Sequence, residues 1–363
     1  MVTPGPMADV HELPYLTADL PGTGGMLRAR VEDFFVDEQP AYLPSGSGDH
    51  VYVRIEKRGL TTRHAVQQLA RALGVNDRDV GVAGMKDRHA VTRQWVSLPP
   101  PLTPEAALAV SVEGVTILEV SRHGNKLRTG HVRANRFVLR VTGADPGAAA
   151  RATAILARLA EPPGAPNWYG EQRFGRDGDN AQKGRELVSG ARRFGKDRKL
   201  DRLLVSALQS ELFNTWLTAR MADGLYRRVL AGDVMKKRAG GMFVCEDPVT
   251  DEARLLAGEL VLTGPMFGDK MRRPTDGSPA AEREAAVLAA AGLASNAFGS
   301  VRALAEGTRR DATIEVAGAR VTPVDDVTYE VGFALPGGAY ATAVMRELMK
   351  TVPQRVDDTP EAA

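Results

Sequence analysis

The stretch Gly81–Trp95 reads GVAGMKDRHAVTRQW and carries a lysine and an aspartate directly after a run of small apolar residues. The apolar run indicates a short buried strand, and the chain then returns toward the interior from Val91 to Trp95. Lys86 and Asp87 therefore fall in the turn between the two. Functional side chains are often carried on loops that a rigid sheet holds in place, so this turn is the first candidate for a functional site.

The residues before this turn show a strand pattern followed by a helix pattern. In His50–Gly59, HVYVRIEKRG, apolar residues alternate with polar ones, as a strand with one buried face requires. Thr61 or Thr62 can then cap a helix that ends before Gly74. Similar signals alternate along the rest of the chain without a repeat of fixed period. The sequence therefore predicts an α/β or α+β fold.

Length and composition set limits on the class of protein. The chain has 363 residues, of which 43% are hydrophobic and 25% are charged, so we expect two or three domains with substantial cores. The formal net charge of +2 argues against a protein that coats nucleic acid indiscriminately, and any charge used for binding must be local. A single cysteine, Cys245, cannot form an internal disulfide or a multi-cysteine zinc site.

The ends and the hydropathy of the chain indicate its compartment. The first residues have no basic segment followed by an apolar core, and no apolar stretch reaches the roughly 18 residues that a membrane span needs. Together with the cysteine count, this predicts a soluble protein of the cytoplasm with no membrane partner.

The segment Val120–Arg140 carries charge of one sign only. It contains six lysines and arginines and two histidines, and it has no aspartate or glutamate. Such a run is either a solvated surface or a surface that binds phosphates. Because no carboxylate compensates the charge over this length, the phosphate-binding interpretation has at least equal weight.

A second module is expected to begin at the proline-rich segment Glu161–Pro166, EPPGAP, since prolines break regular structure. Gly170–Arg202 then has ten lysines and arginines against six acidic residues, and the following Asp201–Met221 has the pattern of an amphipathic helix. Near the end of the chain, strand alternation is followed by a glycine turn and a helix, with Tyr340 close to the turn. Tyr340 faces either a ligand or the core.

Several motifs resemble one family in the order that the family has them. GMKDRHAVTRQ resembles the signature GxKDxxAxTxQ of the TruD family of pseudouridine synthases. PNWYGEQRFGRDGDN, LVSALQSELFN and FALPGGAYATAVMREL are similar to three further blocks of that family, and RARVEDFFVDE and KLRTGHVRANRF complete the set. The resemblance extends from about Met26 to Leu348.

The resemblance implies an enzyme that isomerises uridine 13 of transfer RNA to pseudouridine, without cofactor or metal. Asp87 matches the family's catalytic aspartate. A carboxylate suits this chemistry because it can attack C6 of the base or C1′ of the ribose and leave again. The turn would then hold the carboxylate where a uridine extruded from the RNA stack can reach it.

The resemblance also implies roles for other residues. A cation that keeps Asp87 ionised is Arg28 or Lys86, with Arg28 favoured because it stands at a basic position of the family before the EDF motif. The positions that would line the uridine pocket are Phe34, Asn135, Phe137 and Tyr340. From the residue pattern alone, Phe34 and Phe137 would be assigned to the core. The predicted phosphate contacts are Lys126, Arg128, Arg133 and Arg173.

The family architecture implies a discontinuous catalytic domain, residues 1–163 and 315–363, built on a mixed, largely antiparallel sheet. Residues 164–314 would form an inserted α/β domain. Transfer RNA is the expected partner, and the protein is expected to be a monomer.

Two other interpretations compete with this one. The chain could be an RNA-binding or RNA-folding protein that keeps the fold without turnover, although the intact Asp87 argues against this. It could also be a hydrolase that uses Asp87 with His89 or His64, but the sequence identifies no complete set of nucleophile, base and orienting group.

Overall fold

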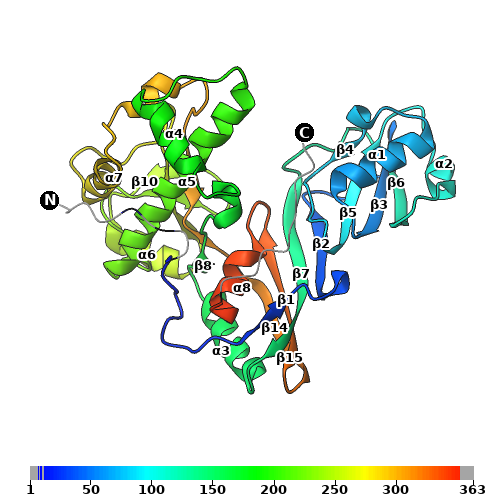
Figure 1. Ribbon diagram of the computed structural model, residues 1–363, viewed down its shortest axis with the longest axis horizontal. Coiled ribbons are helices and arrows are strands. Elements are labelled where there is room, and N and C mark those ends of the chain that lie inside the picture. Colours follow the sequence, from blue (N-terminus) through cyan, green and yellow to red (C-terminus); the bar gives the residue numbers. More distant parts are fainter. Residues whose placement is uncertain (1–6, 8, 10–11, 352–363) are drawn as a thin grey trace. The chain divides into compact units, whose positions relative to one another are not determined.

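The computed structural model describes residues 7, 9 and 12–351, and the chain divides into two compact units. Unit one comprises residues 1–18 and 161–315, and unit two comprises residues 19–160 and 316–363. Figure 1 shows the elements of both units. Within the described residues, no helix combines the length and the apolar composition that crossing a membrane requires.

Unit two is built on a nine-stranded sheet in which only β2 and β5 pair in parallel, so the prediction of a mixed, largely antiparallel sheet is confirmed. The strand order is β14-β15-β7-β2-β5-β3-β6, with β1 paired to β7 and β4 paired to β5. Its strands are β1 (Gly24–Leu27), β2 (Phe34–Pro40), β3 (His50–Arg58), β4 (Gly81–Val82), β5 (Val91–Leu98), β6 (Val115–His123), β7 (Val132–Ala144), β14 (Ala317–Asp325) and β15 (Thr328–Pro336).

Two helices cover one face of this sheet at the end formed by β3, β5 and β6. They are α1 (Thr62–Leu73) and α2 (Pro104–Ala109). The predicted caps of α1 are present, because the Thr61 hydroxyl accepts a hydrogen bond from the His64 N–H and Gly74 adopts a left-handed conformation. Apolar side chains of both helices pack on the inward residues of β3 and β5 in one buried cluster. This packing gives the β4–β5 turn a rigid support.

The other end of the sheet is covered by α3 (Ala148–Ala160) and α8 (Ala341–Met349), which pack against each other and on strands β1, β14 and β15. The Tyr329 hydroxyl and the Thr23 hydroxyl form a buried hydrogen bond of 2.8 Å here. Short 3-10 helices complete the unit, η1 (Val31–Asp33) before β2 and η2 (Asp77–Asp79) before β4.

Unit one contains the long helix α5, whose buried residues share one apolar cluster with side chains of α4, α6 and α7. A four-stranded sheet of order β10-β9-β11-β12 and a two-stranded β13-β8 ladder lie in this unit. Its elements are β8 (Ala165–Pro166), η3 (Glu171–Phe174), α4 (Asn180–Ser189), α5 (Arg198–Ala222), β9 (Val234–Lys237), β10 (Met242–Val244), α6 (Pro248–Leu256), β11 (Leu260–Met266), α7 (Pro279–Ala290), η4 (Ala297–Val301), β12 (Thr308–Asp311) and β13 (Thr313–Ile314).

The two units divide the chain at residues 18–19, 160–161 and 315–316. Leu13 is buried in the apolar core of unit one, and Leu16 packs against that core. This apolar contact groups the start of the chain with unit one, whereas the family resemblance implied that it belongs to the catalytic domain. The assignment of catalysis to residues 1–163 and 315–363 and of an inserted role to 164–314 stays a prediction.

Candidate active site

The β4–β5 loop, residues 83–90, holds Lys86 and Asp87 between two strands of unit two. The Thr62 hydroxyl at the start of α1 accepts the Lys86 N–H at 2.8 Å and donates to Gln94 Oε1 at 2.9 Å. The Gln94 amide in turn donates to the Gly84 carbonyl at 3.3 Å. Because α1 and β5 both form hydrogen bonds with the loop backbone, the backbone positions of Lys86 and Asp87 are fixed.

Lys86 points into the protein and pairs with the Glu38 carboxylate of β2. Both side chains are buried, at 8% and 0% exposure. Burial raises the pKa of the Glu38 carboxyl, and the Lys86 charge opposes that rise. An added Cβ at Gly84 would lie 3.2 Å from Lys86 Nζ, so the glycine leaves room for the amine. Lys86 is therefore engaged away from Asp87.

Asp87 points outward and pairs with Arg28, the residue that follows β1. Arg28 Nη2 donates to Asp87 Oδ2 at 2.6 Å, and the side chains are 12% and 53% exposed. The same guanidinium lies 4.0 Å from the centroid of the Phe34 ring. Arg28 has a φ of 65°, a conformation that costs a non-glycine residue free energy and that is found preferentially at functional sites. The result is an accessible carboxylate beside a sheltered cation.

Lys57 lies behind the loop on β3 and is fully buried. Its amine donates to the backbone carbonyl of Asp87 at 2.7 Å and to the carbonyl of Leu60 at 2.5 Å. Burial lowers the pKa of the Lys57 amine to about 8, the Asp87 charge opposes this shift and the Lys86 charge adds to it.

Asn135 lies near the start of β7, opposite Glu38 on one side and Leu335 on the other. Its Oδ1 is buried and finds no hydrogen-bond donor among the described residues, and the same is true of Glu38 Oε1. Most buried polar atoms in proteins have a hydrogen-bond partner, so the absence of a donor for Asn135 Oδ1 requires an explanation. A ligand that supplies a donor would provide one.

Phe34 and Phe137 are both buried and pack edge to face with ring centroids 6.3 Å apart. Phe137 also contacts the Phe333 ring at 5.4 Å. These contacts are those of core residues, and a contact of Phe34 or Phe137 with a base stays a prediction. Tyr340 differs, since it is 49% exposed at the start of α8.

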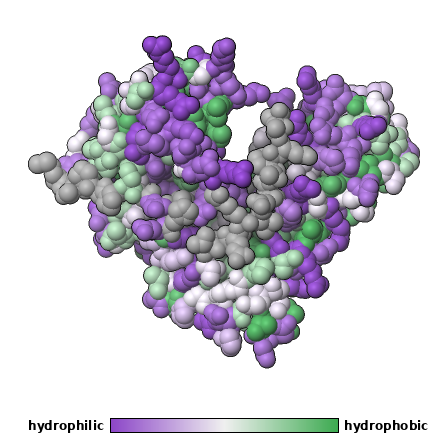
Figure 2. All heavy atoms as spheres, viewed as in Figure 1, coloured by the Kyte–Doolittle hydropathy of each residue, from purple (hydrophilic) through white to green (hydrophobic). Residues whose placement is uncertain are grey.

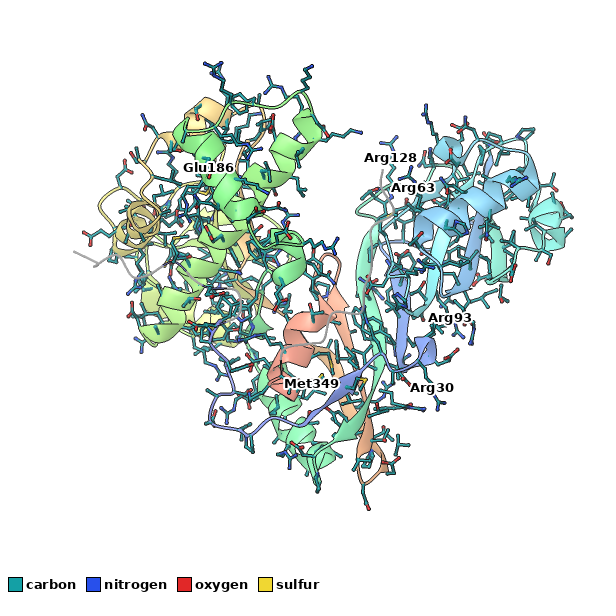
Figure 3. All side chains as sticks on the ribbon, in the orientation of Figure 1. Arg30, Arg63, Arg93, Arg128, Glu186 and Met349 are labelled. Carbon is teal, nitrogen blue, oxygen red and sulfur yellow. The ribbon has the colours of Figure 1, made fainter. Side chains whose placement is uncertain are left out.

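The predicted phosphate contacts fall in both units. Arg128 and Arg133 are exposed in unit two, and the loop that carries Arg128 bonds the β4–β5 loop through the Gly130 N–H and the Ala83 carbonyl at 2.9 Å. Figure 3 labels Arg128, in the connection between β6 and β7, and Arg63, in α1. The Lys126 amine donates to the Arg78 carbonyl at 2.7 Å.

Arg173 lies in η3 of unit one, where its guanidinium donates to the hydroxyls of Ser206 and Ser210 on α5. Its contact with a phosphate stays a prediction, as do those of the other three cations.

Glu38 and Lys57 were not identified from the sequence, although a signal for both is present. Lys57 continues the inward-facing series Val51, Val53 and Ile55 on β3. Glu38 likewise continues the buried alternation of Phe34 and Val36 on β2. A charged residue at a buried position of a strand costs free energy unless it is paired, so such a position is a candidate for a specific role.

Comparisons with known proteins give a consistent result. The model of the family "TruD: tRNA pseudouridine synthase D (TruD)" matches residues 11–193 and 195–348. A protein of Anaeromyxobacter dehalogenans (strain 2CP-C), named tRNA pseudouridine synthase D, is 54% identical over 93% of this chain and 97% of its own. A protein of the same name from Thermus thermophilus is 44% identical over 93% of this chain and 92% of its own.

A solved structure from Methanosarcina mazei that carries the TruD name superposes with a TM-score of 0.76 at 21% identity, over 95% of this chain and 97% of that one. At this identity the likeness supports the fold.

Proposed function

This chain belongs to the TruD family of tRNA pseudouridine synthases, isomerases that convert uridine to pseudouridine in transfer RNA, and we propose that Asp87 is the nucleophile of that reaction in this chain. The observation that carries the proposal is the Asp87–Arg28 pair, in which the carboxylate is 53% exposed and its cation is 12% exposed. A nucleophilic carboxylate must be open to the substrate, and a cation beside it can stabilise its charge, and this pair provides both features.

The reaction requires the enzyme to break the N-glycosidic bond, hold the free uracil, turn it and join it again through C5. Asp87 would attack C6 of the base or C1′ of the ribose and leave at the end. When C5 bonds to C1′ it loses its proton to solvent, and N1, freed from the ribose, takes up a proton, so the product is an isomer of the substrate. The Arg28 guanidinium, 2.6 Å from Asp87, would stabilise the carboxylate before attack and after release.

Two further residues of unit two suit the recognition of a base that has left the RNA stack. The buried and unsatisfied Asn135 Oδ1 can accept a hydrogen bond from the imide N–H of uracil. The exposed ring of Tyr340 can stack on a base. We assign base recognition to Asn135 and Tyr340 on these grounds.

We further infer that the substrate position is uridine 13, which the family resemblance implies. We infer a cytoplasmic enzyme that acts as a monomer, and light scattering of the purified protein with and without transfer RNA tests the oligomeric state.

The substitution Asp87→Asn tests the proposed nucleophile. It keeps the shape of the side chain and removes its charge, so turnover should fall by several orders of magnitude, as for other essential nucleophiles. Release of tritium from C5-labelled uridine in transfer RNA measures turnover, beside a melting curve and a binding titration. Melting and binding should remain normal.

Activity of Asp87→Asn within about tenfold of wild type would remove Asp87 from the chemical step. Tyr15→Phe serves as a control, because it changes a residue of unit one and should leave turnover unchanged.

A further inference from the structure

A strongly charged surface lies in unit one between α4 and α5. In residues 190–203, every residue from 191 to 200 is exposed. Six cations lie in this segment: Arg192, Arg193, Lys196, Arg198, Lys199 and Arg202. Figure 2 shows hydrophilic residues gathered over the part of the unit that contains α4 and the start of α5. We call residues 190–203 the basic segment.

The two acidic residues of the basic segment are used by the backbone. The Asp197 carboxylate accepts the N–H groups of Lys199 and Leu200 and caps α5. The Asp201 carboxylate accepts the Gly195 N–H at 3.1 Å and 3.2 Å from its two oxygens. Within the described part of the chain, none of the six cations forms an ion pair. The positive charge is therefore presented to solvent in a protein whose net charge is only +2.

The basic segment also exposes aromatic surface. The Phe194 side chain is 42% exposed, and the Arg198 guanidinium lies 5.1 Å from its ring centroid. A ring and a guanidinium beside several free cations form a combination that suits single-stranded or looped RNA, where bases stack and phosphates are neutralised. An acidic protein partner would be bound by the cations alone and would not require the exposed ring, so the combination favours RNA.

We propose that the basic segment binds the phosphate backbone and an unstacked base of transfer RNA, at a place in the sequence remote from Asp87. This inference rests on the proposed function, since it takes the same RNA as its ligand. The cations supply most of the affinity through release of counterions, and Phe194 contributes by stacking.

The test combines Arg192→Gln, Arg193→Gln, Lys196→Gln and Lys199→Gln in one variant, and transfer RNA binding is titrated at several salt concentrations. The dissociation constant should rise about tenfold or more, and the slope of log K against log salt should fall by about 3, near 0.7–0.9 for each lost phosphate contact. Phe194→Ala alone should weaken binding and leave the salt slope unchanged.

The matched control removes four cations that are paired with carboxylates on the same unit, by Arg227→Gln, Arg228→Gln, Arg254→Gln and Lys270→Gln. An equal loss of affinity in this control would overturn the proposal, as would an unchanged affinity in the basic-segment variant. Binding to vesicles of anionic phospholipid is measured as well. If the basic-segment variant lost vesicle binding and kept transfer RNA binding, the segment would be assigned to membranes and the proposal would be overturned. Failure of the proposed function would appear elsewhere, as turnover retained by Asp87→Asn.

A second inference concerns Lys57 and rests on a different observation. Its amine is fully buried, and the two acceptors that it bonds are backbone carbonyls rather than a carboxylate. Burying an ammonium in this way is costly. One acceptor is the carbonyl of Asp87 itself, 2.7 Å away, so the amine bonds the residue that we propose as nucleophile. The other is the Leu60 carbonyl, which belongs to the connection into α1.

We infer that Lys57 is a positioning residue, which holds the Asp87 backbone so that the carboxylate meets Arg28 and the substrate in the correct place. Lys57 is 0% exposed and cannot contact RNA directly. Its loss should therefore slow the chemical step and spare binding. Misplacement of a reacting group by about 1 Å can cost about 100-fold in rate.

Lys57→Met tests this inference, because methionine keeps the length of the chain and removes the donor and the charge. The single-turnover rate of tritium release should fall about 100-fold, while the dissociation constant for transfer RNA stays within about twofold. Lys57→Gln, which keeps an N–H donor, should retain more of the rate and decides the matter if Lys57→Met does not fold.

Lys350→Met is the matched control, since the Lys350 amine also donates to a backbone carbonyl, that of Glu347 at 3.2 Å. Its rate should equal that of wild type. A folded Lys57→Met enzyme with a rate within about threefold of wild type would overturn the inference, and so would an equal loss of rate and of affinity. Retained turnover in Asp87→Asn would contradict the proposal that Asp87 is the nucleophile, whereas the comparison of Lys57→Met with Lys350→Met would still test the positioning role of Lys57.

Discussion

At the scale of single residues, the neighbours Lys86 and Asp87 have opposite surroundings. Lys86 turns inward to Glu38 and both are buried, whereas Asp87 turns outward to Arg28 and is half exposed. A buried pair whose partner is removed leaves an uncompensated charge, while a half-exposed pair contributes little to stability. We therefore expect the first pair to support the fold and the second to support the reaction.

Lys86→Met should lower the free energy of unfolding by about 3–5 kcal/mol, because it leaves Glu38 buried without its cation. Arg28→Met should change the free energy of unfolding by about 1 kcal/mol or less and should reduce turnover strongly. Urea unfolding and the tritium assay measure the two effects. Equal destabilisation by the two substitutions would contradict this division of roles.

Lys57 makes a prediction about pH. Its amine has a pKa near 8 in the folded protein and 10.5 as the reference for the unfolded chain. Between these values the unfolded chain binds the additional proton, so stability rises with pH in this window. Relative to Lys57→Met, wild type should gain stability between about pH 8 and pH 10.5. Urea unfolding of both proteins across this pH range tests the prediction. A difference in the free energy of unfolding between wild type and Lys57→Met that stays constant with pH would contradict it.

At the scale of elements, the backbone of the β4–β5 loop forms hydrogen bonds with the elements that flank it. The start of α1 and the strand β5 bond its backbone through Thr62 and Gln94. The β6–β7 connection bonds it through the Gly130 N–H. The acid-free segment Val120–Arg140 includes that connection, so the part of the segment that carries Arg128 is bonded to the β4–β5 loop.

Within this segment, some cations form hydrogen bonds or ion pairs with other residues, and others are exposed to solvent. The Arg140 guanidinium pairs with Glu330, and Arg122 donates to the Gly48 carbonyl. Arg128 and Arg133 are exposed. Arg128→Ala with Arg133→Ala should weaken transfer RNA binding and lower the salt slope by about 1.5–2, as expected for two phosphate contacts.

The matched control for that prediction is Arg122→Ala with Arg140→Ala, which removes the same charge from engaged positions. Filter binding at several salt concentrations compares the two double variants. Unchanged affinity and slope for the Arg128 and Arg133 variant would exclude this part of the segment from the RNA site.

At the scale of the whole molecule, the chain leaves one compact unit and enters another at residues 160–161, and it returns at 315–316. The two ends of the long segment of unit one are joined, because β8 and β13 pair with Ala165 opposite Ile314. Strand partners in such a pair lie about 5 Å apart. An insertion with adjacent ends can fold as a body of its own, and the large apolar core of unit one supports this.

Limited proteolysis of the full chain should therefore release a resistant fragment that begins near residue 161 and ends near residue 315. Compact segments resist cleavage because their backbone is buried and hydrogen-bonded. Mass spectrometry of the digest identifies the fragment ends. Cleavage spread evenly through residues 164–314 would contradict the prediction of an inserted domain.

The sequence alone was sufficient for features that depend on neighbours along the chain. Period-two alternation predicted β3, the capping threonine and Gly74 predicted α1, and the apolar run predicted that Lys86 and Asp87 lie in a turn. These features follow from local side-chain direction and backbone preference. The motif around Asp87 indicated the family by the same local information.

Only the tertiary structure determined which side chains meet. Arg28 bonds Asp87 across 59 residues of sequence, and Lys86 bonds Glu38 across 48. The sequence left Arg28 and Lys86 as alternatives for Asp87, and it gave no partner for Lys57. Such contacts depend on which strands are neighbours and in which register, and a shift of one residue would turn every side chain to the other face. Local periodicity predicts that a strand has a buried face, but the order of the strands in the sheet determines which side chains that face contacts.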